Sequence, residues 1–293
     1  MKISECVELF LSYISDKSPH TLKNYRSDLN QFVKIVGDKD VENVTKADIA
    51  KFRMVLQSQR KKSSTIARKL ACINSFFEYL IDLEVVSSSP ITRSHRPKVS
   101  QKIPSALSHE EIKKVLNATK TLTERVIVVL MLTTGLRSSE LLGIKRNNIL
   151  IEHKGQIYNA DSVYKLEIGG EDILYIRVEG KGGKEREVPI TGEPMELFVE
   201  YLRFNSSDRV FPISYYSLWR MIVNIGRRAG ISLHPHKLRH TAATLALQSG
   251  AELRIIQELL GHASPITTAR YAKVGQKQLL KATKALSENI KLQ

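Results

Sequence analysis

The sequence predicts a mainly α-helical protein with a small antiparallel β-element, organised as two domains. Apolar residues recur at helical spacing through most of the 293 residues. Between residues 157 and 190 the pattern becomes β-rich, with DILYIRVEG and KEREVPI on either side of the turn sequence GKGG. A segment rich in proline, serine and basic residues, 87–104, separates a helical N-terminal domain, 1–86, from a larger domain, 105–293.

Three helices of the first domain are predicted from their starting signals. These signals are Ser18 with Pro19, Thr45 with Asp48, and Ser64 or Thr65. The third helix carries an apolar stripe that includes Ile66, Leu70 and Ile73. The first domain is therefore expected to be a small all-helical unit.

The second domain is expected to begin with a helix, because Ser108 and Glu111 fit a capping box. A strongly apolar helix follows and breaks at Gly135. After the hairpin, helices return beyond Pro212. The tail, 276–290, has an apolar stripe and either folds back on its own domain or docks on a neighbour.

Composition narrows the class of protein. The formal net charge is +15 and the pI is about 9.7, which favours a polyanionic partner, above all nucleic acid. No apolar run approaches the roughly 18 residues of a membrane span, and the N-terminus has no signal-peptide layout. Cys6 and Cys72 lie among apolar neighbours, as buried thiols in a reducing compartment do. We therefore expect a cytoplasmic, nucleoid-associated protein that does not bind membranes.

The segment HPHKLRH, residues 234–240, permits two interpretations. His236 and His240 are four positions apart, as two zinc ligands on one helix face would be. No third ligand is close in sequence, however, and Arg239 beside the histidines suits a phosphate better than a metal ion. Residues that only cap a helix and line a solvated face would look similar.

Several motifs resemble those of tyrosine recombinases of the phage integrase family, in particular the Xer type. The motifs are TTGLRSSELLGI, VEGKGGKEREVPI, HKLRHTAATLALQSG and LLGHASPITTARYA. The residues that match the family's catalytic positions are Arg137, Lys181, His236, Arg239, His262 and Tyr271. The resemblance implies a helical core-DNA-binding domain followed by a tyrosine-recombinase catalytic domain.

The resemblance also implies roles for four of these residues. Arg137 and Arg239 would neutralise the two nonbridging phosphate oxygens, and Tyr271 would attack the phosphorus. A phenol with a pKa of about 10 needs a proton acceptor, and His236 matches that position. The plain alternatives are a salt bridge from Arg137 to Glu140 and core packing for Tyr271.

Lys181, at the predicted hairpin tip, would protonate the leaving 5′ oxygen, with Lys184 as a rival candidate. His262 would donate a hydrogen bond to the phosphate, or would only cap a helix. His240, Glu140 and Thr134 are expected to support the site rather than react. No metal, ATP or other cofactor is implied.

Two basic clusters are candidate DNA contacts. They comprise Lys61, Lys62, Arg68 and Lys69 in the first domain, and Arg220, Arg227 and Arg228 in the second. A solvated charged face would have the same composition. The resemblance implies a clamp of the two domains on double-stranded DNA at a specific recombination site. It also implies a homotetramer on two duplexes, formed from free monomers or dimers through exchange of the tail helix, with a possible second recombinase or DNA translocase as partner.

The leading hypothesis is a recombinase that acts through a 3′-phosphotyrosyl intermediate and resolves chromosome dimers at a dif-like site. A type IB topoisomerase or integrase activity would use the same pocket, although the start of the chain close to its first helix favours the Xer type. A DNA-binding regulator without catalysis would lack one or more pocket residues, and all six are present. A zinc-dependent enzyme is the remaining alternative.

Overall fold

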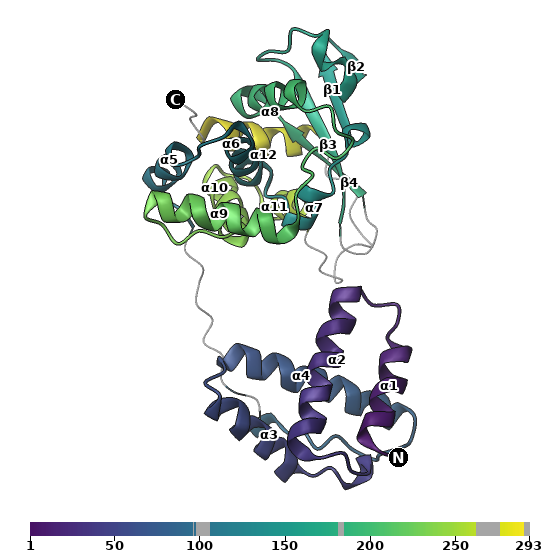
Figure 1. The fold of residues 1–293 in the computed structure, drawn as a ribbon. Coiled ribbons are helices and arrows are strands. Elements are labelled where there is room, and N and C mark those ends of the chain that lie inside the picture. The colour runs from purple at the N-terminus through teal and green to yellow at the C-terminus, as the bar shows by residue number, and fades with distance from the viewer. Residues whose placement is uncertain (96, 98–105, 181–184, 262–275, 290–293) are drawn as a thin grey trace. The chain divides into compact units, whose positions relative to one another are not determined.

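The structure is a computed structural model that describes residues 1–95, 97, 106–180, 185–261 and 276–289. The chain divides into two compact units, Met1–Lys102 and Ile103–Gln293 (Figure 1). Each unit has a hydrophobic core of its own. No helix of the described parts is both long and apolar enough to cross a membrane.

The first unit is helical throughout its regular structure. Its elements are α1 (Ile3–Tyr13), α2 (Pro19–Val36), η1 (Val41–Asn43), α3 (Lys46–Ser58), α4 (Ser63–Asp82) and η2 (Arg93–His95). Helix α2 contacts the other three α-helices (Figure 1). Phe32, Phe52 and Phe76 are fully buried in the core of this unit. The predicted starts of α2 and α3 are confirmed by cap hydrogen bonds, whereas α4 begins at Ser63, slightly earlier than predicted.

The second unit combines helices with one sheet. Its helices are α5 (His109–Asn117), α6 (Leu122–Thr134), α7 (Ser138–Leu142), α8 (Gly192–Phe204), α9 (Tyr215–Ala229), α10 (Pro235–Gln248), α11 (Leu253–Leu260) and α12 (Gln276–Asn289). Its strands and short turns are η3 (Arg146–Asn148), β1 (Ile149–His153), β2 (Gln156–Asn159), η4 (Ala160–Tyr164), β3 (Ile173–Glu179) and β4 (Glu185–Ile190).

The sheet is antiparallel, with the order β2-β1-β3-β4. The hairpin predicted from DILYIRVEG and KEREVPI is the β3–β4 pair, in which Glu179 lies opposite Glu185 at the start of the turn. Strand β1 is too short to stand out in the sequence pattern, and the β-element is therefore larger than predicted.

Helix α6 is the centre of the second unit. Every residue from Val126 to Thr134 is buried, and α6 contacts α10, α8, α12 and β4. The helix ends where the sequence predicted, at Gly135, which has a left-handed φ of +62°. This ending turns the chain so that Arg137 is the N-cap of the next helix, α7.

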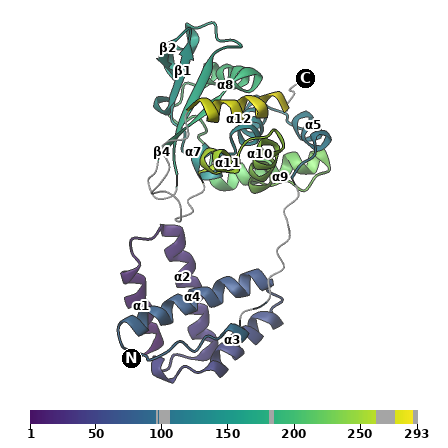
Figure 2. The same ribbon diagram turned by 180° about the vertical axis from the view of Figure 1, so that it is seen from behind.

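Helix α12 packs on its own unit in this structure, against α10, α11, α6, α8 and β4 (Figure 2). Leu286 and Thr283 are buried in this contact, and the Ser287 hydroxyl donates a hydrogen bond to the Thr191 carbonyl. Of the two arrangements expected for the tail, the one on its own domain is therefore the one present here.

Candidate active site

Arg137 is held at the junction of α6 and α7. Its Nη1 donates to Oε1 of Glu140 at 2.6 Å, and its backbone N–H donates to Oε2 at 2.8 Å. Its Nη2 donates to the Gly261 carbonyl at 2.6 Å. The salt bridge considered from the sequence is therefore present, and 29% of the arginine side chain is exposed.

Arg239 is buried on α10 beside Arg137. Its Nη1 donates to the Gly135 carbonyl at 2.5 Å and its Nη2 to the Leu260 carbonyl at 2.6 Å. Its Nη1 also lies 3.9 Å from Oε2 of Glu140. Burial, together with the nearby charge of Arg137, lowers the pKa of Arg239 to about 10. The charged form of Arg239 is therefore less stable than that of a solvent-exposed arginine.

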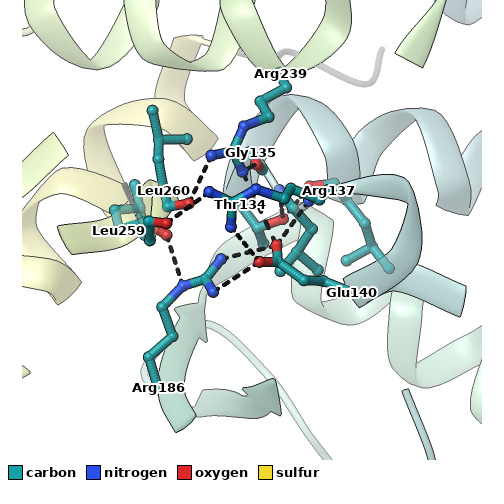
Figure 3. A network of polar contacts seen from close by, with 11 residues as sticks. Thr134, Gly135, Arg137, Glu140, Arg186, Arg239, Leu259 and Leu260 are labelled. Atoms are coloured by element: carbon teal, nitrogen blue, oxygen red, sulfur yellow. Dashed lines mark hydrogen bonds and ion pairs between the residues drawn. The ribbon is translucent and has the colours of Figure 1, made fainter. Parts of the chain in front are cut away.

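A third arginine, Arg186 on β4, completes the network and was not predicted (Figure 3). Its two terminal nitrogens each donate to one Glu140 oxygen at 3.0 Å, and its Nε donates to the Leu259 carbonyl at 3.1 Å. The only sequence signal was its position just past the hairpin turn, in KEREVPI.

Glu140 is the carboxylate that these arginines share. Burial would raise the pKa of Glu140, but hydrogen bonds from Arg186 and Arg137 outweigh it and hold the pKa below its usual value. Three guanidinium groups therefore surround one carboxylate, which leaves a surplus of positive charge. The remaining partners are carbonyls at the ends of α6 and α11, where the helix dipole is negative.

The histidines of HPHKLRH take different positions. His234 is the N-cap of α10 and its Nδ1 accepts from the Lys237 backbone N–H at 3.1 Å. Burial, with the charges of His236 and Lys237, lowers the pKa of His234. His236 is exposed on the first turn, and His240 lies one turn further along and is half-buried. In the described part of the chain, no three His, Cys, Asp or Glu side chains are grouped to hold a metal.

The other candidate catalytic residues, Lys181, His262 and Tyr271, lie outside the described residues, as does Lys184. Two of them directly follow described positions. Gly180 precedes Lys181, and Gly261, whose carbonyl accepts from Arg137, precedes His262. The structure therefore brings Arg137 and Arg239 together and says nothing of the placement of these four.

Comparison with known proteins decides the family. The sequence pattern of the phage integrase family matches residues 105–278, and that of the phage integrase N-terminal SAM-like domain matches residues 7–83. This chain belongs to the phage integrase family.

Relatives and solved structures agree with this membership. The chain is 32% identical to tyrosine recombinase XerC of Staphylococcus saprophyticus, over 96% of this chain and 95% of that one. It is 30% identical to tyrosine recombinase XerD of Halalkalibacterium halodurans, over 88% of each. A lambda integrase dimer bound to a COC′ core site has the same fold, with a TM-score of 0.69 at 17% identity, over 94% of this chain and 100% of that one.

The basic residues of the first unit of this integrase-family protein differ in exposure. Lys61 and Lys62 are exposed before and at the start of α4. Arg68 and Lys69 both contact Asp28, but Arg68 keeps 51% of its side chain exposed, whereas Lys69 is buried. The charge of Lys69 is therefore directed inward, to a carboxylate, unlike that of its neighbours.

The basic residues of the second unit lie on α9. Arg220, Arg227 and Arg228 are all exposed, and Arg228 in addition donates to the Ala118 carbonyl and to Glu124, the latter at 2.5 Å. Tyr216 and Trp219, which precede Arg220 in the sequence, are exposed and stack on each other with ring centroids 6.4 Å apart. The sequence analysis did not single out these two aromatic residues, although the alternation of aromatic and basic residues in YYSLWR was a usable signal.

Proposed function

We propose that this protein is a site-specific DNA recombinase that cuts and rejoins DNA through a 3′-phosphotyrosyl intermediate. The observation that carries the proposal is the convergence of Arg137 and Arg239 on Glu140 and on the carbonyls at the end of α11, in one cluster with surplus, partly desolvated positive charge. Such a cluster stabilises the extra negative charge that a phosphodiester gains when a nucleophile attacks it.

The two arginines bind the nonbridging oxygens of the target phosphate. Arg137 is the more accessible of the two, and Arg239 is held by carbonyl groups that fix its direction. Because the donors are preorganised, little reorganisation is needed at the transition state. Glu140 holds Arg137 from behind by two hydrogen bonds, which keeps its guanidinium in place.

The remaining steps are assigned to residues that match the family's motifs. Tyr271 attacks the phosphorus and its proton passes to His236. The bond to the 5′ oxygen breaks, and that oxygen takes a proton from Lys181, while His262 donates a hydrogen bond to the phosphate. Attack by the 5′ hydroxyl of a partner strand reverses these transfers and joins new ends, so that phosphodiester bonds are conserved.

Residues 1–86 are assigned as a DNA-binding domain, 87–104 as a linker and 105–293 as the catalytic domain with a C-terminal exchange helix. The family matches at 7–83 and 105–278 support these limits. Lys61, Lys62, Arg68, Arg220 and Arg227 keep exposed charge for phosphate contacts. Lys69 and Arg228 contribute mainly by holding Asp28 and Glu124 in place.

The acting assembly is a homotetramer on two duplexes. A similar structure is a lambda integrase tetramer bound to a Holliday junction, with a TM-score of 0.66. Here α12 buries Leu286 on its own unit, and exchange of this helix for that of a neighbour would repeat the same contact between subunits. The names XerC and XerD among the relatives support chromosome-dimer resolution at a dif-like site, in the cytoplasm.

Covalent capture tests this proposal and identifies the target site in the same experiment. The protein is incubated with nicked, fragmented DNA from its source organism and quenched with denaturant, and the attached DNA is sequenced. Tyr271→Phe is run in parallel, with Tyr164→Phe, which changes an exposed tyrosine of the same unit, as the matched control.

We expect attachment at one recurring sequence with the wild type and Tyr164→Phe, and none with Tyr271→Phe. Attachment that persists in Tyr271→Phe would mean that the nucleophile is another residue. Tight, saturable DNA binding without any covalent product would favour a regulator over a recombinase.

A further inference from the structure

We propose that Arg186 is a positioning residue that locks the β3–β4 hairpin, Glu140 and the end of α11 into one arrangement around the phosphate pocket. The inference rests on the proposed function and extends it to a residue on a different element from the two phosphate-binding arginines. Arg186 is not an isolated surface charge, since only 13% of its side chain is exposed.

Three hydrogen bonds give Arg186 this role. The guanidinium fork meets both oxygens of Glu140 at 3.0 Å, and its Nε meets the Leu259 carbonyl at 3.1 Å (Figure 3). Only an arginine has donors in this rigid arrangement; a lysine has one ammonium on a flexible stem and cannot span the same acceptors.

The hydrogen bonds from Arg186 to Glu140 determine how the carboxylate oxygens are shared with Arg137 and Arg239. Arg186 supplies one donor to each Glu140 oxygen, and Arg137 supplies the others. Arg239 therefore remains at 3.9 Å from the carboxylate and is held by carbonyls instead. Without Arg186, we expect Glu140 to draw Arg239 away from those carbonyls.

The contact with α11 places Arg186 beside the chain that leads to His262. A Cβ added at Gly261 would lie 2.7 Å from Nη1 of Arg186, so glycine is required for this approach. Gly261 also presents its carbonyl to Arg137. Arg186 and Arg137 thus hold the end of α11 from two sides.

The position of Arg186 in the sheet links the same contacts to the hairpin. Arg186 lies opposite Val178, and the next pair, Glu179 with Glu185, is the last before the turn. Lys181, the proposed acid, lies between these two strands in the sequence. Fixing Arg186 therefore fixes the base of the hairpin relative to the pocket.

The test is single-turnover cleavage of a nicked duplex that carries the captured site, by wild type, Arg186→Met and Arg186→Lys. Loss of a residue that orients a metal ligand slows reactions by roughly 10- to 100-fold, and because Arg186 orients Glu140 in the same way we expect a loss in that range for both variants. Arg177→Met is the matched control, because Arg177 lies on the adjacent strand and pairs with Glu187 at the surface, and it should cleave at the wild-type rate.

The pH profile separates positioning from a general loss of fold. Glu140 faces Arg137 from α7, Arg186 from β4 and Arg239 from α10. The hydrogen bonds from Arg186 lower the pKa of Glu140, whereas burial raises it. Without Arg186 we therefore expect the pKa of Glu140 to rise, so that its carboxyl group becomes protonated at higher pH. A protonated Glu140 no longer holds Arg137 by an ion pair. We expect the ratio of wild-type to Arg186→Met rates to increase as the pH falls, because the Glu140 carboxyl group takes up its proton at higher pH in the variant than in the wild type. The double variant Glu140→Gln/Arg186→Met should show no such increase relative to Glu140→Gln.

A readout independent of cleavage is the carbon-13 signal of the Glu140 carboxyl group, identified by its loss in Glu140→Gln. In Arg186→Met this signal should titrate at higher pH than in the wild type. If the wild type forms no covalent adduct with DNA, the proposed function fails. The titration of Glu140 still tests whether Arg186 controls the state of that carboxyl group. Unchanged titration, or wild-type cleavage by Arg186→Met across the pH range, would overturn the inference.

Discussion

In the described part of each unit, a buried carboxylate is surrounded by cationic side chains, Asp28 in the first unit and Glu140 in the second, and the two clusters differ in where their surplus charge lies. Asp28 accepts from Lys69 at 2.6 Å and from both terminal nitrogens of Arg68. Lys69 is buried, but Arg68 is half exposed, so the surplus charge is hydrated. Around Glu140, by contrast, Arg186 and Arg239 are both largely buried.

The pKa shifts express the same difference. The hydrogen bond to Asp28 raises the pKa of Arg68, whereas burial and the charge of Arg137 lower the pKa of Arg239. The first cluster is satisfied and serves to join α2 to α4. In the second cluster, by contrast, the charge of Arg239 is desolvated and lies close to that of Arg137. Similar ion pairs thus differ in the solvation of their surplus charge, and groups with strongly shifted pKa values are more frequent at functional sites.

The largest expected effect is the loss of folding free energy when the carboxylate of the first cluster, Asp28, is removed. Asp28→Asn leaves the Lys69 ammonium buried without its counter-ion, and breaking a buried pair in this way costs about 3 to 5 kcal/mol. Amide hydrogen exchange of α2 and α4 in the full chain would measure the loss.

The matched control is Glu8→Gln, which removes an exposed pair with Arg26 in the same unit. We expect at most about 1 kcal/mol for that change. If Asp28→Asn altered exchange no more than Glu8→Gln, the Asp28 cluster would not be structural.

The second effect concerns the anion site. Arg239→Met should slow covalent attachment by about 10²- to 10³-fold, as the loss of one preorganised charge-stabilising donor does. Sulfate should stabilise the wild type and Asp28→Asn against unfolding, but not Arg239→Met. At ten times its dissociation constant, sulfate would contribute about 1.4 kcal/mol.

Chloride at matched ionic strength is the control for general salt effects in these unfolding measurements. Equal stabilisation of Arg239→Met and the wild type by sulfate would show that the surplus charge around Glu140 does not bind anions.

The smallest expected effect is the difference in stability between alanine substitutions at two glycines that end helices. Gly135 and Gly230 both end helices with left-handed φ, at +62° and +69°. A Cβ at Gly230 meets nothing within 4 Å, so Gly230→Ala should cost only the backbone strain of about 1 to 2 kcal/mol. A Cβ at Gly135 would lie 2.3 Å from Cδ2 of Leu260, and overpacking adds roughly 1 to 3 kcal/mol.

Urea unfolding of the two variants would measure this difference. Since the Gly135 carbonyl also holds Arg239, Gly135→Ala should slow attachment, while Gly230→Ala should not. Equal unfolding costs for the two variants would contradict the close packing at Gly135.

Local signals predicted much of the fold. The capping residues Ser18, Thr45 and Ser108 all cap helices as expected, and Gly135 ends α6. These features depend on residues within one helical turn, which is the range over which sequence patterns are informative. The family motifs also assigned Arg137 and Arg239 to one site, and both guanidinium groups lie near Glu140 in the structure.

Long-range contacts could not be predicted in the same way. Arg186 finds its acceptors 46 and 73 positions away, and in the sequence it resembles any outward-facing residue of a strand. Lys69 is a different case, because it lies on the apolar stripe between Ile66 and Ile73. Its burial was therefore readable from helical periodicity, although its partner Asp28 was not.

The large sequence separation between Arg137 and its acceptor, Gly261, has a consequence for synthesis of the chain. Arg137 donates to the carbonyl of Gly261, 124 positions later, so its acceptor does not yet exist when the arginine leaves the ribosome. Contacts of such separation form late in folding. A growing chain, which is tethered beside messenger RNA, therefore carries no finished phosphate pocket until nearly all of it has been translated.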